Sequence, residues 1–148
     1  MTASPQLRGL AYALTSAAAL AATASQLGTY LPLGLIEGNV RFWGDTLANP
    51  ASRFITADIF FVFLVVWHWM LGEARRLGMR GPTIVAYFLG SLLIAFSAAL
   101  PLFMWHRERL MAARGEAPAR IGGLAAQVSV WVVLFACLAY SWRAWPGH

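Results

Sequence analysis

The sequence contains no lysine, a single cysteine and few charged residues of either sign. Its 148 residues carry a formal net charge of +5, yet only 11% of them are charged, whereas roughly 25% is usual in a soluble domain. Because Cys137 is alone, an intrachain disulfide, a CxxC motif and a cysteine zinc site are excluded. No run of basic residues lies in a polar segment, so we expect no nucleic-acid partner.

Several chemical signatures are also absent. The sequence has no HExxH motif, no pair of acids at helical spacing within an apolar run, no Walker loop and no dinucleotide fingerprint. We therefore expect neither a metal site nor a resident cofactor. Helix packing in a membrane, lipid binding and acid–base chemistry on a few isolated side chains remain as function classes.

Long apolar runs make up most of the sequence. Of its residues 59% are hydrophobic, and the mean hydropathy is +0.62. The runs match the roughly 20 residues that a helix needs to cross the hydrocarbon core. We therefore predict an all-α integral membrane protein, a four-helix transmembrane bundle in one domain (residues 1–148), with the lipid bilayer of a cell inner membrane around it. The predicted helices cover approximately residues 9–36, 54–72, 83–105 and 122–142.

The first apolar run allows two interpretations. It could be a signal peptide, with Arg8 as its basic flank and small residues at a cleavage site near residues 22–24. The run continues past the length of a typical signal, which favours an uncleaved helix whose alanine-rich face lets a neighbour approach closely. We expect Pro32, with Gly28 and Gly34, to kink or end this helix, because proline lacks a backbone donor.

The segments between the helices are expected to be short. Residues 37–53 are predicted to form a loop with an aromatic pair at headgroup level, and residues 73–82 a tight connection. Residues 106–120 are polar and could form a short interfacial helix. Pro101 is expected to kink the third helix near its far end.

Arginine positions give no orientation for four spans, although cytoplasmic loops usually carry an excess of basic residues. The termini and the 73–82 connection hold Arg8, Arg75, Arg76, Arg80 and Arg143. The other two loops hold Arg41, Arg53, Arg107, Arg109, Arg114 and Arg120. Because both sides receive similar numbers, the orientation stays open.

The polar residues inside the apolar runs form the candidate site. In a four-span bundle the end of the third helix and the start of the second lie on one side, so Asp58, His106, Arg107 and Glu37 would share one depth. An ionised carboxylate inside a bilayer costs about 2.5–3.5 kcal/mol, so Asp58 would be paired with Arg107, hydrated or protonated. A neutral Asp58 or Glu37 could donate a proton to an alkene or an epoxide. Alternatively, Asp58 is a structural acid near the positive end of its helix. The aromatic residues expected in the surrounding pocket are Trp43, Phe61 and Trp105.

His68 is a separate candidate. It lies ten residues after Asp58, about 15 Å further along the same helix, and therefore far in depth from His106. This separation argues against two histidines that clamp one haem. His68 could hold a haem or pigment as a single ligand, or it could be an interfacial imidazole in a belt of aromatic residues.

Three segments carry a resemblance to a known family: LANPASRFITAD (residues 47–58), FLVVWHWMLGEARRLGMR (63–80) and AFSAALPLFMWHRER (95–109). The chain resembles a family of small bacterial membrane proteins of unknown function, over roughly residues 5–110. The resemblance implies a membrane bundle and a pairing of Asp58 with Arg107, and it implies no activity. Where this chain has His68, the family often has an acid. A looser, purely architectural similarity links the chain to membrane terpene cyclases and sterol isomerases.

These observations support three hypotheses of function. The first is a non-catalytic accessory or lipid-binding protein that acts in a larger membrane complex or as a homo-oligomer, with the alanine-rich face of the first helix as its contact surface. The second is an enzyme, an acid-initiated isoprenoid cyclase or isomerase that uses Asp58 or Glu37 and stabilises a carbocation on aromatic rings. The third is a haem or pigment carrier through His68.

Overall fold

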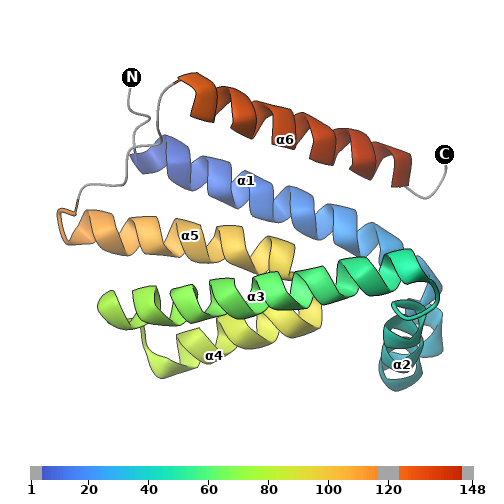
Figure 1. Ribbon diagram of the computed structural model, residues 1–148. Helices are drawn as coiled ribbons and strands as arrows, with labels where there is room; N and C mark the ends of the chain where they lie inside the picture. Colours follow the sequence, from blue (N-terminus) through green and yellow to red (C-terminus); the bar gives the residue numbers. More distant parts are fainter. Residues whose placement is uncertain (1–4, 117–123, 145–148) are drawn as a thin grey trace.

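The computed structural model describes residues 5–116 and 124–144, and every regular element in these ranges is helical (Figure 1). The prediction of an all-α protein is therefore confirmed. Short 3-10 turns follow the first helix at Ser25–Thr29 and Leu31–Leu33, and a π-helical segment occupies Ser91–Ala95. The α-helices are α1 (Pro5–Ala24), α2 (Leu35–Asp45), α3 (Pro50–Arg76), α4 (Gly81–Gly90), α5 (Phe96–Ala113) and α6 (Leu124–Ala144).

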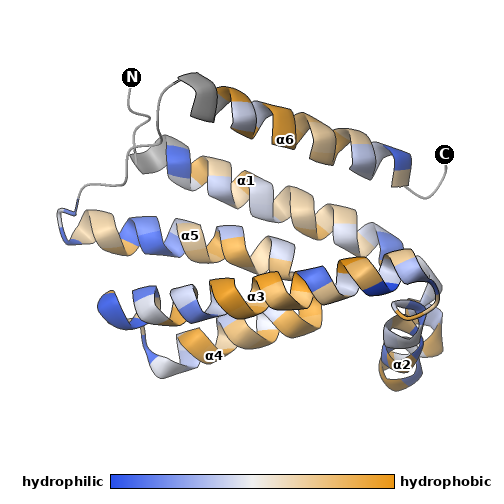
Figure 2. Ribbon diagram, in the orientation of Figure 1, coloured by the Kyte–Doolittle hydropathy of each residue, from blue (hydrophilic) through white to orange (hydrophobic). Residues whose placement is uncertain are grey.

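Length and hydropathy identify three segments that could cross a membrane, Arg8–Thr29, Pro50–Arg76 and Gly81–Ala113, and a shorter apolar helix at Val128–Ala144. Apolar residues dominate the middle of these helices, and hydrophilic residues gather near the two ends of the molecule (Figure 2). The chain is a multi-pass membrane protein, as its composition predicts. The first helix ends at Ala24, twelve residues before the predicted limit at residue 36, and Gly28 and Pro32 lie in the 3-10 turns that follow it.

The third predicted helix is not straight. Ala95 adopts an extended conformation (φ −166°, ψ 122°), and the chain folds back there, so that α4 and α5 run in opposite directions (Figure 1). The hydroxyl of Tyr87 lies 3.1 Å from Nδ1 of His106, whereas a straight helix would separate two residues at this spacing by about 28 Å. The prediction of one helix over residues 83–105, kinked at Pro101, is therefore wrong.

Membrane thickness gives a physical reason for this reversal. The helical segment Gly81–Ala113 has 33 residues, which would extend about 50 Å in a straight line, against a hydrocarbon core of about 30 Å. Folding at Ala95 divides it into two antiparallel pieces. As a result, the start of α1 and the end of α6 lie at opposite ends of the molecule (Figure 1), whereas four straight spans would place both termini on one side.

The expected loop at residues 37–53 contains α2, which lies across the end of the bundle (Figure 1). The Tyr30 hydroxyl donates a hydrogen bond to Asp45 Oδ2 (2.9 Å) and so ties α2 to the preceding turn. This bond to a carboxylate raises the pKa of Tyr30. The following helix α3 begins with a capping box, in which Asn49 Oδ1 accepts from the Ser52 backbone N–H (2.9 Å). Residues 49–50, which lie in the segment expected to be a loop, thus start a helix, with Pro50 in the first helical position.

Helices α3 and α5 end in the same way, at one end of the molecule. Gly78 (φ 62°) and Gly115 (φ 70°) take the left-handed conformation after the last turn. Met79 N–H bonds to the Ala74 carbonyl and Glu116 N–H to the Met111 carbonyl, the long hydrogen bond of a Schellman motif. Helix α5 therefore continues to residue 113, well into the segment that was expected to be a separate interfacial helix.

Small residues let α1 and α5 pack closely along most of their length. A Cβ atom on Gly9 would lie 3.2 Å from the Trp105 ring, and Ser16 Oγ donates to the Ala98 carbonyl (2.8 Å). Part of the alanine-rich face of the first helix is thus used inside the molecule. A buried cluster of Met70, Phe103 and Ala74 joins α3 to α5.

Candidate functional site

The predicted pairing of Asp58 with Arg107 does not form. Arg107 Nε lies 2.6 Å from Glu73 Oε2, and Glu73 is 15 residues beyond Asp58 on α3, about 22 Å along the helix. The pairing is wrong because the reversal at Ala95 carries the end of α5 to the C-terminal end of α3. Asp58 is exposed and has no hydrogen bond or ion pair with any residue that the structure describes.

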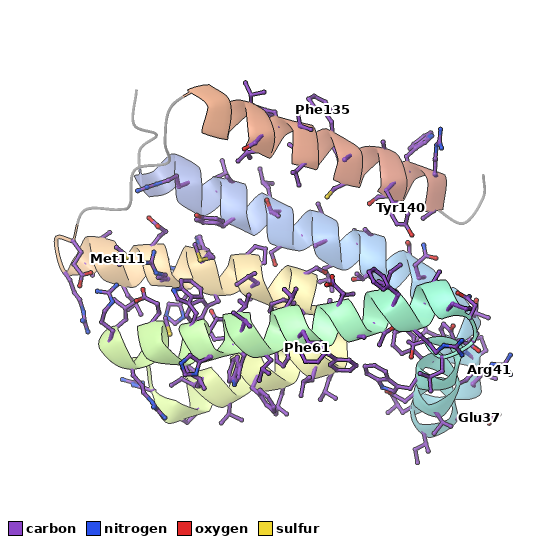
Figure 3. All side chains as sticks on the ribbon, in the orientation of Figure 1. Glu37, Arg41, Phe61, Met111, Phe135 and Tyr140 are labelled. Carbon is purple, nitrogen blue, oxygen red and sulfur yellow. The ribbon has the colours of Figure 1, made fainter. Side chains whose placement is uncertain are left out.

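The other predicted site residues are divided between the two ends of the molecule. Glu37 is exposed on the first turn of α2 and points away from the bundle (Figure 3). Trp43 stacks on Phe60 at 5.8 Å between ring centroids and holds α2 against α3. Phe61 is exposed, as is His68 on α3. Trp105, His106 and Arg107 stay together on α5, at the end that lies away from α2.

At this end, acids and arginines alternate in a charge network. Arg107 bridges two acids, Glu73 on α3 and Glu108 on α5, whose Oε1 lies 3.6 Å from Arg107 Nη1. Glu108 also pairs with Arg8 on α1 (3.3 Å). Glu73 pairs with Arg76 (3.0 Å), which reaches Glu116 after α5. The six side chains of this network are Arg8, Glu73, Arg76, Arg107, Glu108 and Glu116.

The inner half of the charge network is largely screened from solvent. The side chains of Arg107 and Glu73 are each 16% exposed, and that of Glu108 is 7% exposed. The guanidinium of Arg107 also lies 5.8 Å from the centre of the Trp69 ring, a cation–π contact. Removing one partner from a buried pair leaves an uncompensated charge. The charge network therefore fixes α1, α3 and α5 relative to one another.

Beside the charge network, an apolar cavity of about 410 Å³, open on the side of the exposed Leu20, Ile94 and Leu102, lies between α1, α4 and α5. We call it the α1–α4–α5 cavity. The π-helical segment and the reversal at Ala95 form part of its wall, and such irregular segments occur often at functional sites. Its lining includes Ser16, Leu20, Thr83, Tyr87, Ile94 and Ala98.

Tyr87 connects the cavity to the charged end. It lines the cavity, shares a hydrogen bond with His106 Nδ1 (3.1 Å) and packs edge-on against Phe103 at 5.3 Å. His106 precedes Arg107 on α5. The cavity thus has a polar side with the hydroxyls of Tyr87 and Thr83, while the remaining wall is mostly aliphatic.

The lining of the cavity carries no charged side chain among the described residues, and Tyr87 is its one ionisable side chain. The three acids of the charge network, Glu73, Glu108 and Glu116, are each paired with an arginine. In the described parts of the chain, no three His, Cys, Asp or Glu side chains gather as metal ligands.

Sequence reasoning missed Glu73, Glu108 and Tyr87. One local signal existed, because Glu73 and Arg76 are three residues apart on a helix, a spacing that favours an ion pair. The contacts with Arg107 and Arg8 depend on the reversal, which no local signal marks. His106 was expected at the same depth as Asp58, yet it lies at the other end of the molecule, where its partner is Tyr87.

Comparison with known proteins gives one match. A family model described as "Protein of unknown function DUF2834" matches residues 11–109, which run from α1 into α5 and include most of the charge network and cavity. The match stops before α6. No curated protein and no solved structure shows significant similarity to the chain.

Proposed function

The chain belongs to DUF2834, a family of proteins of unknown function, and we propose that it is a non-catalytic lipid-binding protein of the cell inner membrane. The ligand is an isoprenoid or another lipid with a long hydrocarbon chain, held in the α1–α4–α5 cavity. The family match covers all the residues that line this cavity.

The observation that carries this proposal is the cavity itself. Its volume of about 410 Å³ falls within the roughly 300–1,000 Å³ that is typical of small-molecule sites. Small side chains such as Ala86, Gly90 and Ala98 leave this space open between helices that otherwise pack closely. The hydroxyls of Thr83 and Tyr87 offer hydrogen bonds to a polar head at one side, while the hydrocarbon chain lies against Leu20 and Ile94.

The proposal is tested by filling the cavity. Ala86→Phe would place a ring in the cavity from α4, and Val85→Phe is the matched control, because Val85 is exposed on the same helix and does not line the cavity. We would purify each full-length protein in mild detergent and measure bound lipids by mass spectrometry. Ala86→Phe should lose a stoichiometric lipid that the wild type and Val85→Phe retain. Equal lipid content in all three proteins, or bulk phospholipid alone, would refute the proposal.

The enzyme and carrier hypotheses stay predictions. Asp58 and Glu37 are outside the cavity lining, so an acid-initiated cyclase or isomerase would need its substrate on an exposed face of α3 or α2. Loss of isoprenoid turnover in Asp58→Asn, with normal insertion, would support that enzyme. Visible absorbance that disappears in His68→Ala would support a haem or pigment carrier. Neither hypothesis has a structural observation in its favour.

An accessory role in a larger membrane complex, or as a homo-oligomer, is compatible with lipid binding. Part of the α1 face that was expected to contact a partner already packs against α5, and the rest of it is exposed. A partner subunit that remains bound in mild detergent would add this role to the proposal.

A further inference from the structure

The reversal at Ala95 gathers most of the described arginines at one end of the molecule, which we call the arginine-rich end. This end consists of the start of α1, the turn between α3 and α4, and the end of α5. Its arginines are Arg8, Arg75, Arg76, Arg80, Arg107, Arg109 and Arg114. Of the described arginines only Arg41, Arg53 and Arg143 lie at the opposite end.

The acids divide evenly between the two ends, whereas the arginines do not. The net positive charge therefore lies at one end. Glu73, Glu108 and Glu116 lie at the arginine-rich end and are engaged in the charge network. The other three acids, Glu37, Asp45 and Asp58, lie at the opposite end. The arginine-rich end therefore has an excess of positive charge, while the opposite end is balanced.

Three arginines at this end are available to an outside partner. Arg75, Arg80 and Arg109 are exposed, and none has an acidic partner among the described residues. Arg109 lies over the Trp105 ring at 4.9 Å, and tryptophan is enriched at the membrane–water interface. Exposed arginines beside an interfacial ring are suited to phosphate oxygens, which a guanidinium binds with two parallel hydrogen bonds.

We infer that the arginine-rich end lies at the cytoplasmic face of the membrane, where Arg75, Arg80 and Arg109 bind anionic phospholipid headgroups. An excess of basic residues marks the cytoplasmic side of a multi-pass protein, and anionic lipids of that leaflet attract basic residues near its surface. A straight third helix would divide the arginines between both sides and leave the orientation open. This inference is independent of any ligand in the cavity.

The orientation is tested with single cysteines in full-length protein in which Cys137 is replaced by alanine. Gly81→Cys and Ala113→Cys report on the arginine-rich end, and Gly44→Cys reports on the opposite end. All three positions are exposed, and a Cβ atom at either glycine meets no neighbour within 4 Å. A membrane-impermeant maleimide should label Gly44→Cys in spheroplasts, and the other two only after lysis. Labelling of positions 81 and 113 from opposite sides, or of both from outside, would overturn the inference.

Headgroup binding is tested with the triple variant Arg75→Gln, Arg80→Gln, Arg109→Gln. The matched control is Arg53→Gln with Arg143→Gln, which removes arginines from the opposite end. Each protein is exposed to mixed micelles of phosphatidylglycerol and phosphatidylcholine, and the retained lipids are counted by native mass spectrometry. Because each arginine contributes about fivefold in affinity for an anionic surface, the triple variant should bind phosphatidylglycerol about a hundredfold more weakly. Wild-type retention in the triple variant would refute headgroup binding.

Discussion

Glu73 is the residue on which the charge network depends most. It accepts hydrogen bonds from two arginines, Arg76 on its own helix and Arg107 on α5. The contact with Arg107 joins α3 to α5, and the two residues are 34 positions apart along the chain. Because the partners are largely shielded, this contact stabilises the fold only while both charges are present.

We therefore predict that Glu73→Gln lowers the free energy of unfolding in detergent by about 3 kcal/mol, the lower bound for breaking a buried ion pair. The measurement is the unfolding midpoint in a denaturant series, followed by circular dichroism. Glu37→Gln is the matched control, because Glu37 is exposed on α2 and pairs with none of the described residues. Equal midpoints for both variants would mean that the pair contributes no net stability.

The hydrogen bond between Tyr30 and Asp45 makes the stability depend on pH. The Tyr30 hydroxyl donates to the Asp45 carboxylate, which raises the pKa of Tyr30 above its ordinary value of about 10. The contribution of this hydrogen bond to folding stability is therefore complete below pH 10, and it is lost as the pH rises through the raised pKa of Tyr30. Titration of tyrosinate absorbance, as the difference between wild type and Tyr30→Phe, should give a midpoint that falls in Asp45→Asn. An unchanged midpoint would exclude Asp45 as the cause.

The sequence predicted which residues at the end of the apolar run are candidates, but it did not predict the residues that they contact. Arg107, His106 and Trp105 are polar or aromatic residues at the end of an apolar run. Arg107 belongs to the charge network, His106 bonds to the cavity residue Tyr87, and Trp105 contacts Arg109. Their partners Glu73 and Tyr87 could not be predicted, since those contacts require α5 to run back along α4. Asp58 was a predicted site residue because it is an acid in an apolar run. It is exposed, and its side chain has no partner among the described residues.

At the scale of an element, the glycine at position 78 decides how sharply α3 turns into α4. Its φ of 62° is left-handed, and a Cβ atom there would also approach Arg114 Nη2 at 3.3 Å. We predict that Gly78→Ala lowers stability by about 1–2 kcal/mol, the cost of a left-handed conformation for a residue with a side chain.

Gly72→Ala is the control for this prediction. Gly72 lies inside α3, is exposed, and would meet no atom within 4 Å on gaining a Cβ. Because alanine favours helix over glycine, this variant should gain up to about 1 kcal/mol. Unfolding midpoints measured side by side should move in opposite directions. Midpoints that move the same way would contradict the turn geometry at position 78.

Elements were predictable where local chemistry defines them and not where packing does. Apolar length predicted the positions of α3 and α6 to within four residues, whereas α1 ends twelve residues before its predicted limit. Helix α3 begins at Pro50, inside the segment that was expected to be a loop. The amphipathic α2 lies in the segment that was predicted to be a loop, because it is short and has charged residues at both ends. The reversal falls at Ala95, which is neither glycine nor proline, so nothing in the local sequence marks it. The helical segment of 33 residues is evident only in the structure, because the sequence divides it into an apolar run up to residue 105 and a polar segment after it.

For the whole molecule, α6 is an addition to a core formed by α1, α3, α4 and α5. Nearly all of its described side chains are exposed, and Phe135 points away from the other helices (Figure 3). A hydrogen bond from Gln26 to the Ala144 carbonyl (2.9 Å) links its end to the segment after α1. The charge network and the cavity lie on other elements, and the family match ends at residue 109.

We therefore predict that a chain truncated after Glu116 still inserts and folds. It keeps every described partner of the charge network, so Glu73→Gln should destabilise the truncated and full-length proteins by equal amounts, as expected for sites that share no contacts. The measurement is a double-mutant cycle of unfolding midpoints in one detergent. A larger loss in the truncated protein would mean that α6 stabilises the charge network. Equal losses of unfolding free energy would mean that the stability of the ion pairs does not depend on α6. This result is expected if α1–α5 form the folding unit.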